Sequence, residues 1–307
     1  MCFTHNFWQL TVSGLALGSV YALIALGYTL VYGVLQLINF AHSEVFMLGG
    51  FGGLFMVKAL PHASPHGMSS VGLVVMGMIG GGIAGALVAF LLERVAYRPL
   101  RRRGAPKLAF LISAIGASLF LLNLSGKEFG RFNNTLPDLY TSGPVFHIFS
   151  AAVTTTQLVI AGAALVMLIG LDRLIALTRL GQGIRAVAQD SQAASLMGVD
   201  IDKTITRTFV IGGILGGVAG FLFGIQFGVQ YNMGFAAGTK AFTAAVLGGI
   251  GNVRGAVLGG LVLGVAENLG VSCIQSAWRD VIAFGILVAI LMVRPTGLLG
   301  ERLGRSA

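Results

Sequence analysis

The chain has 307 residues, of which 55% are hydrophobic and only 10% are charged, and its formal net charge is +9. A soluble domain usually carries about 25% charged residues, so this chain has too little polar material to cover a soluble surface. We therefore expect most of its surface to face lipid. The net positive charge does not indicate nucleic-acid binding, because the basic residues lie between apolar stretches and not on one soluble face.

Long uncharged stretches predict membrane-spanning helices. The only acidic or basic residue from Asn6 to Val57 is Glu44, and none lies from Ala59 to Leu92. A spanning helix needs roughly 20 mainly apolar residues, and these stretches are long enough. The expected fold class is an all-α polytopic membrane protein, with residues 1–307 forming one transmembrane domain. Its eight hydrophobic segments are expected at 10–35, 39–60, 70–92, 107–124, 151–171, 204–228, 240–272 and 278–294.

The basic residues predict an orientation. Three regions hold 14 of the 20 Lys and Arg residues: 93–107, 172–207 and the tail, with Arg294, Arg302 and Arg305. Because membrane proteins gather Lys and Arg in cytoplasmic loops, we expect loops 93–107 and 172–203 and the C-terminus to be cytoplasmic. The loop 125–150 is then external.

Segment 240–272 is too long for one simple span, and a glycine-rich run from Gly248 to Gly255 interrupts it. Broken helices are tolerated inside membranes where the backbone lines a cavity or is covered by protein. We favour a broken or re-entrant helix pair here, with a short helix, a glycine turn and a returning helix. The alternative is one long, tilted and kinked helix.

Glycine spacing predicts close helix packing. The chain has 46 glycines, and many recur four residues apart, so they share a helix face. Small residues at this spacing let helix backbones approach closely in lipid. Whether these faces meet inside the chain or against another subunit stays open. The rows are Gly77, Gly81 and Gly85; Gly212, Gly216, Gly220, Gly224 and Gly228; and Gly255 with Gly259.

The segment 181–203 is polar overall but helix-prone between Ile184 and Met197. Gly198 suits the left-handed position that follows a helix. A short amphipathic helix of this kind can rest on the membrane surface or serve as a docking site for another protein. Its alanines would permit close approach, and charged groups such as Arg185 and Asp190 would supply oriented polar contacts. The residues alone favour neither reading.

Residues 192–198 resemble the Glu-Ala-Ala-xxx-Gly loop of bacterial ATP-binding-cassette permeases. The resemblance to branched-chain amino-acid permeases, and specifically to their H-type subunit, extends over nearly the whole chain. Gln192 replaces the glutamate of the loop motif, and Ser43 stands where glycine is common in the family. The matching motifs are Gly18-Ser19-Val20-Tyr21-Ala22-Leu23, Ile38-Asn39-Phe40-Ala41-His42-Ser43-Glu44, Arg185-Ala186 and Thr243-Ala244-Ala245-Val246-Leu247-Gly248-Gly249-Ile250-Gly251.

The resemblance implies a heteromeric importer in the bacterial inner membrane. Its other parts would be a second homologous permease, two cytoplasmic ATPases and an extracytoplasmic amino-acid-binding protein. The segment 184–198 would be the coupling helix that seats in the ATPase. The chain has no phosphate-binding loop, so ATP and Mg would be hydrolysed by the partners and no cofactor is expected here. The expected coupling residues are Arg185, Ala186, Asp190, Gln192, Ala193, Ala194, Met197 and Gly198.

Glu44 and Glu267 are the two notable acids at membrane depth. A charge there is costly and usually faces protein interior or water. With Asn39, Ser43 and Asn268 they could line a passage for a zwitterionic amino acid. The favoured alternative is structural, with both acids in hydrogen bonds between helices. Asn39 also suits an N-cap before the second segment.

Two other functions are alternatives to an ATP-driven importer. A stand-alone secondary transporter or channel, for a small polar solute such as urea, would use Glu44 or Glu267 for protons or a cation. The long polar stretch 172–203 argues against it. An enzyme is not expected, because the sequence has no catalytic constellation and no metal-ligand cluster with zinc spacing. The cargo stays open among branched-chain and other amino acids, urea and amides.

Overall fold

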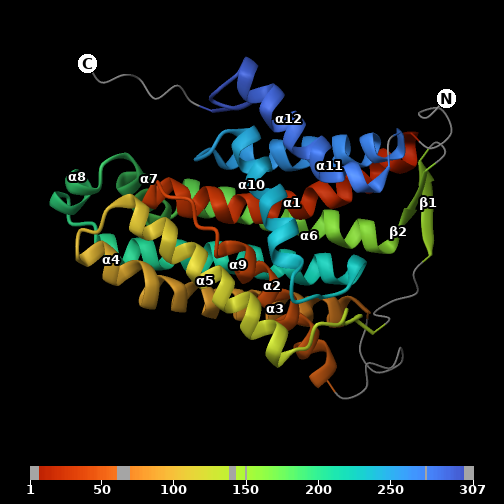
Figure 1. Cartoon of the computed structure of the whole chain (residues 1–307), viewed down its shortest axis with the longest axis horizontal. Helices are drawn as coiled ribbons and strands as arrows, with labels where there is room; N and C mark the ends of the chain where they lie inside the picture. Colours follow the sequence, from red (N-terminus) through yellow and green to blue (C-terminus); the bar gives the residue numbers. More distant parts are fainter. Residues whose placement is uncertain (1–6, 61–69, 138–142, 149–150, 274, 301–307) are drawn as a thin grey trace.

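The computed structural model describes residues 7–60, 70–137, 143–148, 151–273 and 275–300. They form a bundle of long helices with a two-stranded hairpin at one end (Figure 1). The elements are α1 (Phe7–Leu35), α2 (His42–Ala59), α3 (Ser70–Leu92), the π-helical turn η1 (Glu93–Tyr97), α4 (Arg98–Arg102), α5 (Lys107–Glu128), β1 (Pro144–Ile148), β2 (Ala151–Thr154), α6 (Thr155–Leu177), α7 (Arg179–Gln189), α8 (Ser191–Leu196), α9 (Ile201–Phe227), α10 (Met233–Gly248), α11 (Val253–Cys273), the 3-10 turn η2 (Ser276–Trp278) and α12 (Arg279–Val293).

The all-α polytopic prediction is confirmed, since each expected hydrophobic segment corresponds to a helix or a helix pair. Among the described residues, six helices are long and apolar enough to cross a membrane. The predicted start of the helical segment 151–171 was wrong, because residues 151–154 form the strand β2, which pairs antiparallel with β1. The helix begins only at Thr155 because Thr154 and Gln157 form a capping box, in which each side chain accepts the other's backbone N–H.

The predicted break in segment 240–272 is confirmed, and the single kinked helix is excluded. The first helix, α10, ends at Gly248, and α11 begins at Val253. Gly249 has φ of +106°, which favours glycine. The Asn252 side chain then accepts the backbone N–H groups of Arg254 and Gly255 at 3.0 and 3.1 Å. The shorter helix, α10, runs across the direction of α1 and α9 (Figure 1).

Two of the predicted loops are largely helical. The stretch 93–107 continues α3 through η1 and α4 as far as Arg102, and most of 172–203 belongs to α6, α7 and α8. The predicted loop 125–150 begins late, because α5 runs to Glu128. Its residues 138–142 and 149–150 lie outside the described residues, as does the tail 301–307 with two of its three arginines.

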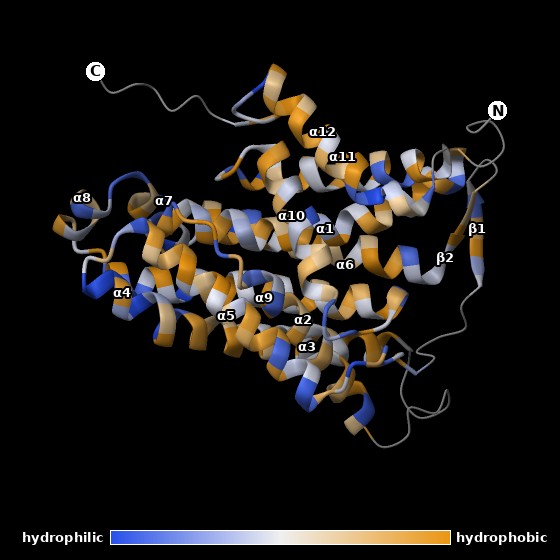
Figure 2. Ribbon diagram, viewed as in Figure 1, coloured by the Kyte–Doolittle hydropathy of each residue, from blue (hydrophilic) through white to orange (hydrophobic). Residues whose placement is uncertain are grey.

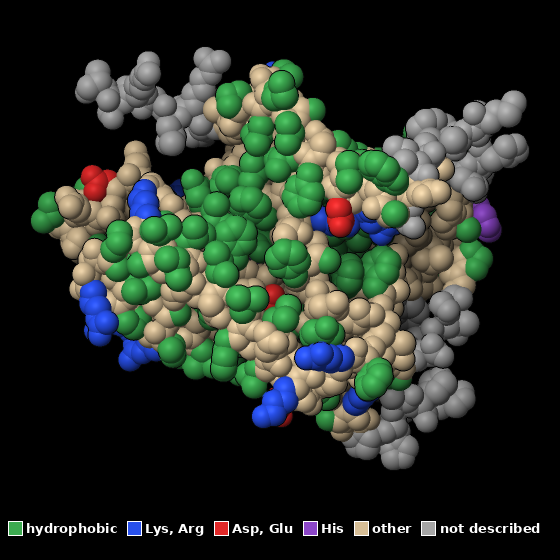
Figure 3. Space-filling model, viewed as in Figure 1, with side chains coloured by type: hydrophobic (Ala, Val, Ile, Leu, Met, Phe, Trp, Pro, Cys, Tyr) green, Lys and Arg blue, Asp and Glu red, His purple; other side chains and the backbone are tan. Residues whose placement is uncertain are grey.

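The bundle has two distinct ends. The helices α4, α7 and α8 lie at one end and the β1–β2 hairpin at the other, and we call these the α8 end and the hairpin end (Figure 1). Apolar residues dominate the helices between the two ends (Figure 2). Hydrophobic side chains also cover much of the surface seen in Figure 3. Helices α5 and α6 are apolar yet only 17% buried in their most hydrophobic stretches, as expected of helices that face lipid or another membrane subunit.

Close backbone contacts hold the centre of the bundle together, as the glycine spacing predicted. Helix α9 is 72% buried in its most hydrophobic stretch and packs on α2 and α3. A Cβ on Gly217 would clash with the Gly81 carbonyl and lie 3.1 Å from the Gly85 Cα. A Cβ on Gly220 would clash with the Phe46 carbonyl of α2. These glycine faces are therefore internal contacts of the chain.

Four charged side chains tie α10, α11 and α12 together near the hairpin end. Glu267 is fully buried, and its Oε1 lies 2.9 Å from Lys240 Nζ and 3.1 Å from Arg279 Nε. Lys240 also lies 3.0 Å from Asp280 Oδ1. A buried ion that keeps only some of its partners is costly, so the cluster fixes the relative positions of the three helices.

Gly217→Val is expected to destabilise the isolated chain. The larger side chain would force α9 away from α3, and overpacking of this kind costs about 3 kcal/mol. We expect a marked fall in the Tm of the detergent-solubilised protein. Gly162→Val on α6 is the matched control, because a Cβ there meets no atom within 4 Å. An unchanged Tm for Gly217→Val would contradict the packing account.

Glu267→Leu is expected to destabilise the chain more than the double variant Lys240→Met/Glu267→Leu. The single change leaves two cations near the site with one acid, and removing one partner of a buried pair costs about 3–5 kcal/mol. The double variant keeps Arg279 and Asp280, whose charges balance. Thermal unfolding in detergent measures both. Lys240→Met is measured as the second single variant, and a double variant whose loss of stability equals the sum of the two single losses would show that the charges act independently.

Candidate functional site

The α8 end carries the segment that was expected to couple the chain to an ATPase. Helix α7 is amphipathic and buries Gly181, Ile184 and Val187 against the bundle. Thr178 caps its N-terminus by accepting the Gly181 N–H at 3.1 Å. Arg185 of α7 donates from Nη1 to the Ile175 carbonyl of α6. The conformation of the segment is therefore fixed by the bundle and by its own caps.

The prediction of one helix over 184–198 was wrong, because the segment forms two helices that meet at Asp190. This residue has an extended backbone (φ −153°, ψ 109°). Its Oδ1 accepts the N–H groups of Gln192 and Ala193 at 2.8 and 3.0 Å, which starts α8 in a new direction. Asp190 therefore sets the change of direction between α7 and α8, and its Oδ1 is already engaged in these two hydrogen bonds. The left-handed Gly198 was predicted correctly, with φ of +85°.

The tip of the segment is an exposed apolar pair. Leu196 and Met197 are 88% and 85% exposed, while Ala194 is buried against the bundle. Gln192 and Ala193 are also exposed, and Ala186 is half-buried. We define the docking surface as Gln192, Ala193, Leu196 and Met197. Sequence reasoning missed Leu196, although two consecutive apolar residues before a helix-ending glycine in a polar segment are a recognisable signal.

Beyond the docking surface the chain turns directly into α9. Asp200 accepts the Lys203 N–H at 3.0 Å and caps α9. Hydrogen bonds from Lys203, first from its backbone N–H and then from its side chain, hold the pKa of the Asp200 carboxyl below its usual range. Only residues 197–200 separate α8 from α9.

An ionic cluster links the start of α9 to η1 and α4, and sequence reasoning missed it. Arg101 Nη2 lies 2.6 Å from Asp202 Oδ1 and 2.9 Å from Glu93 Oε1. The other Glu93 oxygen accepts the Thr206 hydroxyl at 3.0 Å. Arg98 and Arg102 each lie 3.1 Å from Asp202. Several of the arginines that predicted a cytoplasmic loop are thus bound to acids on neighbouring helices.

The five expected pathway residues do not form one site. Asn39 does not cap α2, because the N-cap is Ala41; its Oδ1 instead accepts the Tyr97 hydroxyl at 2.7 Å. Asn268 donates to the Gly264 carbonyl of its own helix at 3.1 Å. Glu267 belongs to the ion cluster with Lys240, Arg279 and Asp280, three residues that sequence reasoning did not assign. Ser43 and Glu44 lie together beside a cavity.

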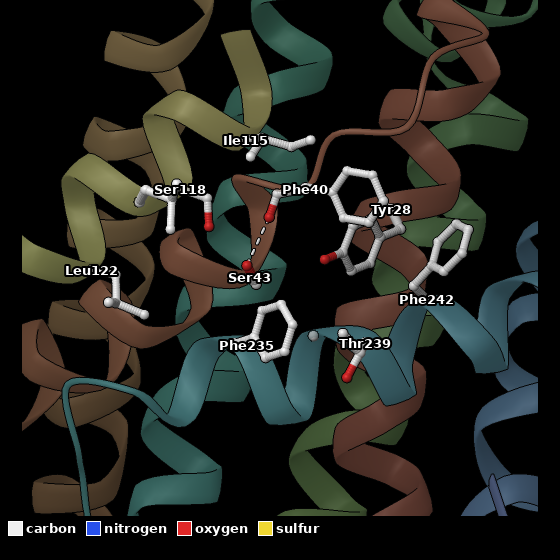
Figure 4. A pocket seen from close by; sticks show the side chains of 11 residues that line it. Tyr28, Phe40, Ser43, Ile115, Ser118, Leu122, Phe235, Thr239 and Phe242 are labelled. Atoms are coloured by element: carbon white, nitrogen blue, oxygen red, sulfur yellow. Dashed lines mark hydrogen bonds between the residues drawn. The ribbon is translucent and has the colours of Figure 1, made fainter. Parts of the chain in front are cut away.

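This cavity has a volume of about 280 Å³, is lined by α1, α2, α5 and α10, and opens to the surface beside the exposed side chains of Leu119 and Phe235 (Figure 4). Most of its wall is apolar, with hydroxyl groups at a few points. The fully buried Glu44 accepts the Ser118 hydroxyl at 3.1 Å. The Ser43 hydroxyl donates to the Phe40 carbonyl at 2.7 Å, and its oxygen lies 3.3 Å from the same Glu44 oxygen. The lining residues are Tyr28, Phe40, Ser43, Ile115, Ser118, Leu119, Leu122, Phe235, Gly238, Thr239 and Phe242.

A second cavity, of about 290 Å³, lies on another side of α10. Its lining includes Tyr21, Gln230, Asn232, Lys240 and Arg279. Thr239 lines the first cavity and Lys240 the second, so α10 separates the two. Among the described residues, no group of three or more His, Cys, Asp or Glu side chains could hold a metal ion. The arrangement suits passage or binding of a small solute beside α10.

Comparison with known proteins agrees with this architecture. The family model for the permease component of branched-chain amino acid transport systems matches residues 10–291. The chain is 44% identical over 299 residues to the high-affinity branched-chain amino acid transport system permease protein LivH of Salmonella typhimurium, with 96% of each chain covered. It is 43% identical to LivH of Escherichia coli K12, again over 96% of each chain. It is 42% identical to BraD of Pseudomonas aeruginosa, over 97% of each. The chain therefore belongs to the branched-chain amino acid transport permease family.

Proposed function

We propose that this chain is a permease subunit of an ATP-binding-cassette importer for branched-chain amino acids. The relatives with 42–44% identity are named as permeases of high-affinity branched-chain amino acid transport systems. The helices provide several spans, and the sequence has no phosphate-binding loop, so in this proposal ATP is hydrolysed by other subunits. The proposed partners are a second homologous permease, two cytoplasmic ATPases that hydrolyse ATP with Mg, and an extracytoplasmic amino-acid-binding protein.

The observation that carries this proposal is the docking surface on α8. An apolar pair almost fully exposed on a short, capped helix suits insertion into a cleft of another protein. Its neighbours, Asp190 and Gly198, fix the two ends of α8, so little conformational entropy is lost on binding. We assign the docking surface to the ATPase. In this assignment Arg185, Ala186, Asp190, Ala194 and Gly198 position the surface without forming its exposed centre.

The path from the docking surface into the membrane is short. Val199 donates its N–H to the Ala194 carbonyl at 3.0 Å, and Asp200 caps α9. Movement of α8 would therefore be passed to α9, and through Asp202 and Arg101 to η1 and α4. π-Helical turns within α-helices are frequent at functional sites, and η1 lies at this junction. We propose that closure of the ATPases moves α9 relative to α3 and thereby alternates access to the cargo pathway.

The same proposal fixes the orientation. The α8 end, with the arginines of α4, would face the cytoplasm of the bacterium, and the hairpin end would face outward. The segment after α12 packs on the α10–α11 turn, where the Leu298 N–H bonds to the Leu247 carbonyl at 2.8 Å. The C-terminus would then leave on the cytoplasmic side, as the positive-inside rule predicts.

The stand-alone carrier for a small polar solute such as urea is the weaker alternative. Such a carrier would need an acid free to exchange a proton or cation. Glu267 is bound to Lys240 and Arg279, so it is better explained as a structural group. Asn268 and Asn39 are also used within the fold. Of the expected pathway residues, Ser43 and Glu44 remain as the candidates beside a cavity.

Leu196→Asp is expected to uncouple the importer. Removing a central apolar anchor costs about 2 kcal/mol or more, which corresponds to roughly a 30-fold weaker hold on the ATPase. In the reconstituted complex, we expect cargo-stimulated ATP hydrolysis to fall toward the unstimulated rate and uptake to fall by at least about tenfold.

Leu196→Met is the matched control, because it keeps an apolar side chain of similar volume, and it should transport as the unmodified chain does. The Tm values of the assembled complexes establish that both variants are folded. A Leu196→Asp variant that assembles with the ATPases and transports at the normal rate would overturn the docking assignment.

A further inference from the structure

The cavity between α2, α5 and α10 has a size and a lining that suit a small apolar group. Its volume is about 280 Å³, and a dry apolar cavity of about 150 Å³ is already large enough to bind benzene. Ile115 and Leu122 of α5 face Phe235 and Phe242 of α10 across it (Figure 4), and Leu119 of α5 also lines it. A branched aliphatic side chain therefore fits within this space.

Three hydroxyl groups on the cavity wall, those of Ser43, Ser118 and Thr239, donate their hydrogens within the protein. Ser118 donates its hydroxyl hydrogen to Glu44 Oε1 at 3.1 Å. Ser43 donates to the Phe40 carbonyl at 2.7 Å, and Thr239 to the Ala236 carbonyl at 3.1 Å. A hydroxyl has one donor and two acceptor lone pairs, so what these groups offer to a ligand is acceptors. Such a wall suits a ligand group that donates hydrogen bonds.

A buried carboxyl group stands behind this wall. Glu44 is fully buried, and its Oε2 has no hydrogen-bond partner among the described residues. Gly234 of α10 adjoins it, since a Cβ there would lie 3.0 Å from Oε2. A buried acid without a cation at membrane depth is costly. A positively charged ligand group close to Ser118 would offset that cost.

We propose that this cavity is the cargo subsite that receives the branched side chain and the α-ammonium group of the amino acid. This inference rests on the proposed function and names the part of the molecule that recognises the cargo. The apolar residues of α5 and α10 contact the side chain. The Ser43 and Ser118 hydroxyl oxygens accept hydrogen bonds from the ammonium group, and Glu44 supplies the balancing negative charge.

The chemistry separates this cargo from other solutes. A solute that carries a carboxylate but no ammonium group would meet acceptor oxygens backed by an acid, and would be repelled. Urea and other neutral amides can donate hydrogen bonds, but they neither fill an apolar cavity nor compensate Glu44. A small amino acid such as alanine has the ammonium group and leaves the apolar space unfilled. The subsite therefore discriminates by side-chain volume and by positive charge together.

The first test changes the volume of the cavity in the complete reconstituted importer. Leu122→Phe fills the space between α5 and α10, whereas Leu124→Phe places the same change on α5 away from the lining residues. Uptake of leucine is compared with uptake of the smallest amino acid that the binding protein delivers. We expect Leu122→Phe to lower the ratio about tenfold or more and Leu124→Phe to leave it unchanged.

The second test removes the polar wall. Ser118→Ala should lower leucine uptake about tenfold without weakening binding of the loaded binding protein to the complex, while Ser113→Ala, elsewhere on α5, should not. Glu44→Gln keeps the volume and removes the charge, and the same loss is expected. Tm values of the assembled complexes establish that each variant is folded.

The outcomes separate this inference from the proposed function. Equal loss of both cargoes in Leu122→Phe, or normal leucine uptake in folded Ser118→Ala, would overturn the subsite while leaving the importer intact. An unmodified complex that imports no branched-chain amino acid would overturn the proposed function, and the subsite with it. A changed cargo ratio together with the Ser118→Ala loss supports both.

Discussion

The contact between the backbones of α9, α2 and α3 is the constraint on which the other features depend. Gly217 and Gly220 allow α9 to approach the carbonyls of Gly81 and Phe46, which no larger side chain would permit. Hydrophobic burial gives little drive for helix association in lipid, so close packing must supply the specificity. Because α2 is held against α9, Ser43 and Glu44 keep a fixed position beside α10.

Helix α9 also connects the two regions to which function is assigned. Its N-terminus follows the docking surface and binds η1 and α4 through Asp202, whereas its middle contacts α2, which carries the cavity wall. A shift of α9 relative to α3 would therefore change both the ion pairs of Asp202 with α4 and the packing of α2 around Glu44. On the other side of α10, the ion pairs of Lys240, Glu267, Arg279 and Asp280 connect α10 to α11 and α12.

The sequence predicted that the hydrophobic segments are helices, because this depends on apolar length, although only six of the described helices are long and apolar enough to cross a membrane. It predicted the break at Gly248–Gly255 because glycine there is a local signal. It predicted Gly198 correctly for the same reason. It missed the turn at Asp190, since an aspartate that caps a new helix looks like a polar residue within a continuing one. The partners of Glu267 and Glu44, and the cavity itself, depend on which helices become neighbours. Spacing within one helix carries no information about Ser118 meeting Glu44.

The most direct test of the central claim is ATP hydrolysis by the chain co-purified with its second permease, ATPases and binding protein, measured across leucine, isoleucine, valine and urea. The account predicts stimulation by the branched-chain amino acids, only when the binding protein and all subunits are present, with no stimulation by urea. Uptake of solute by the purified chain alone, driven by an ion gradient without the ATPases, would contradict it.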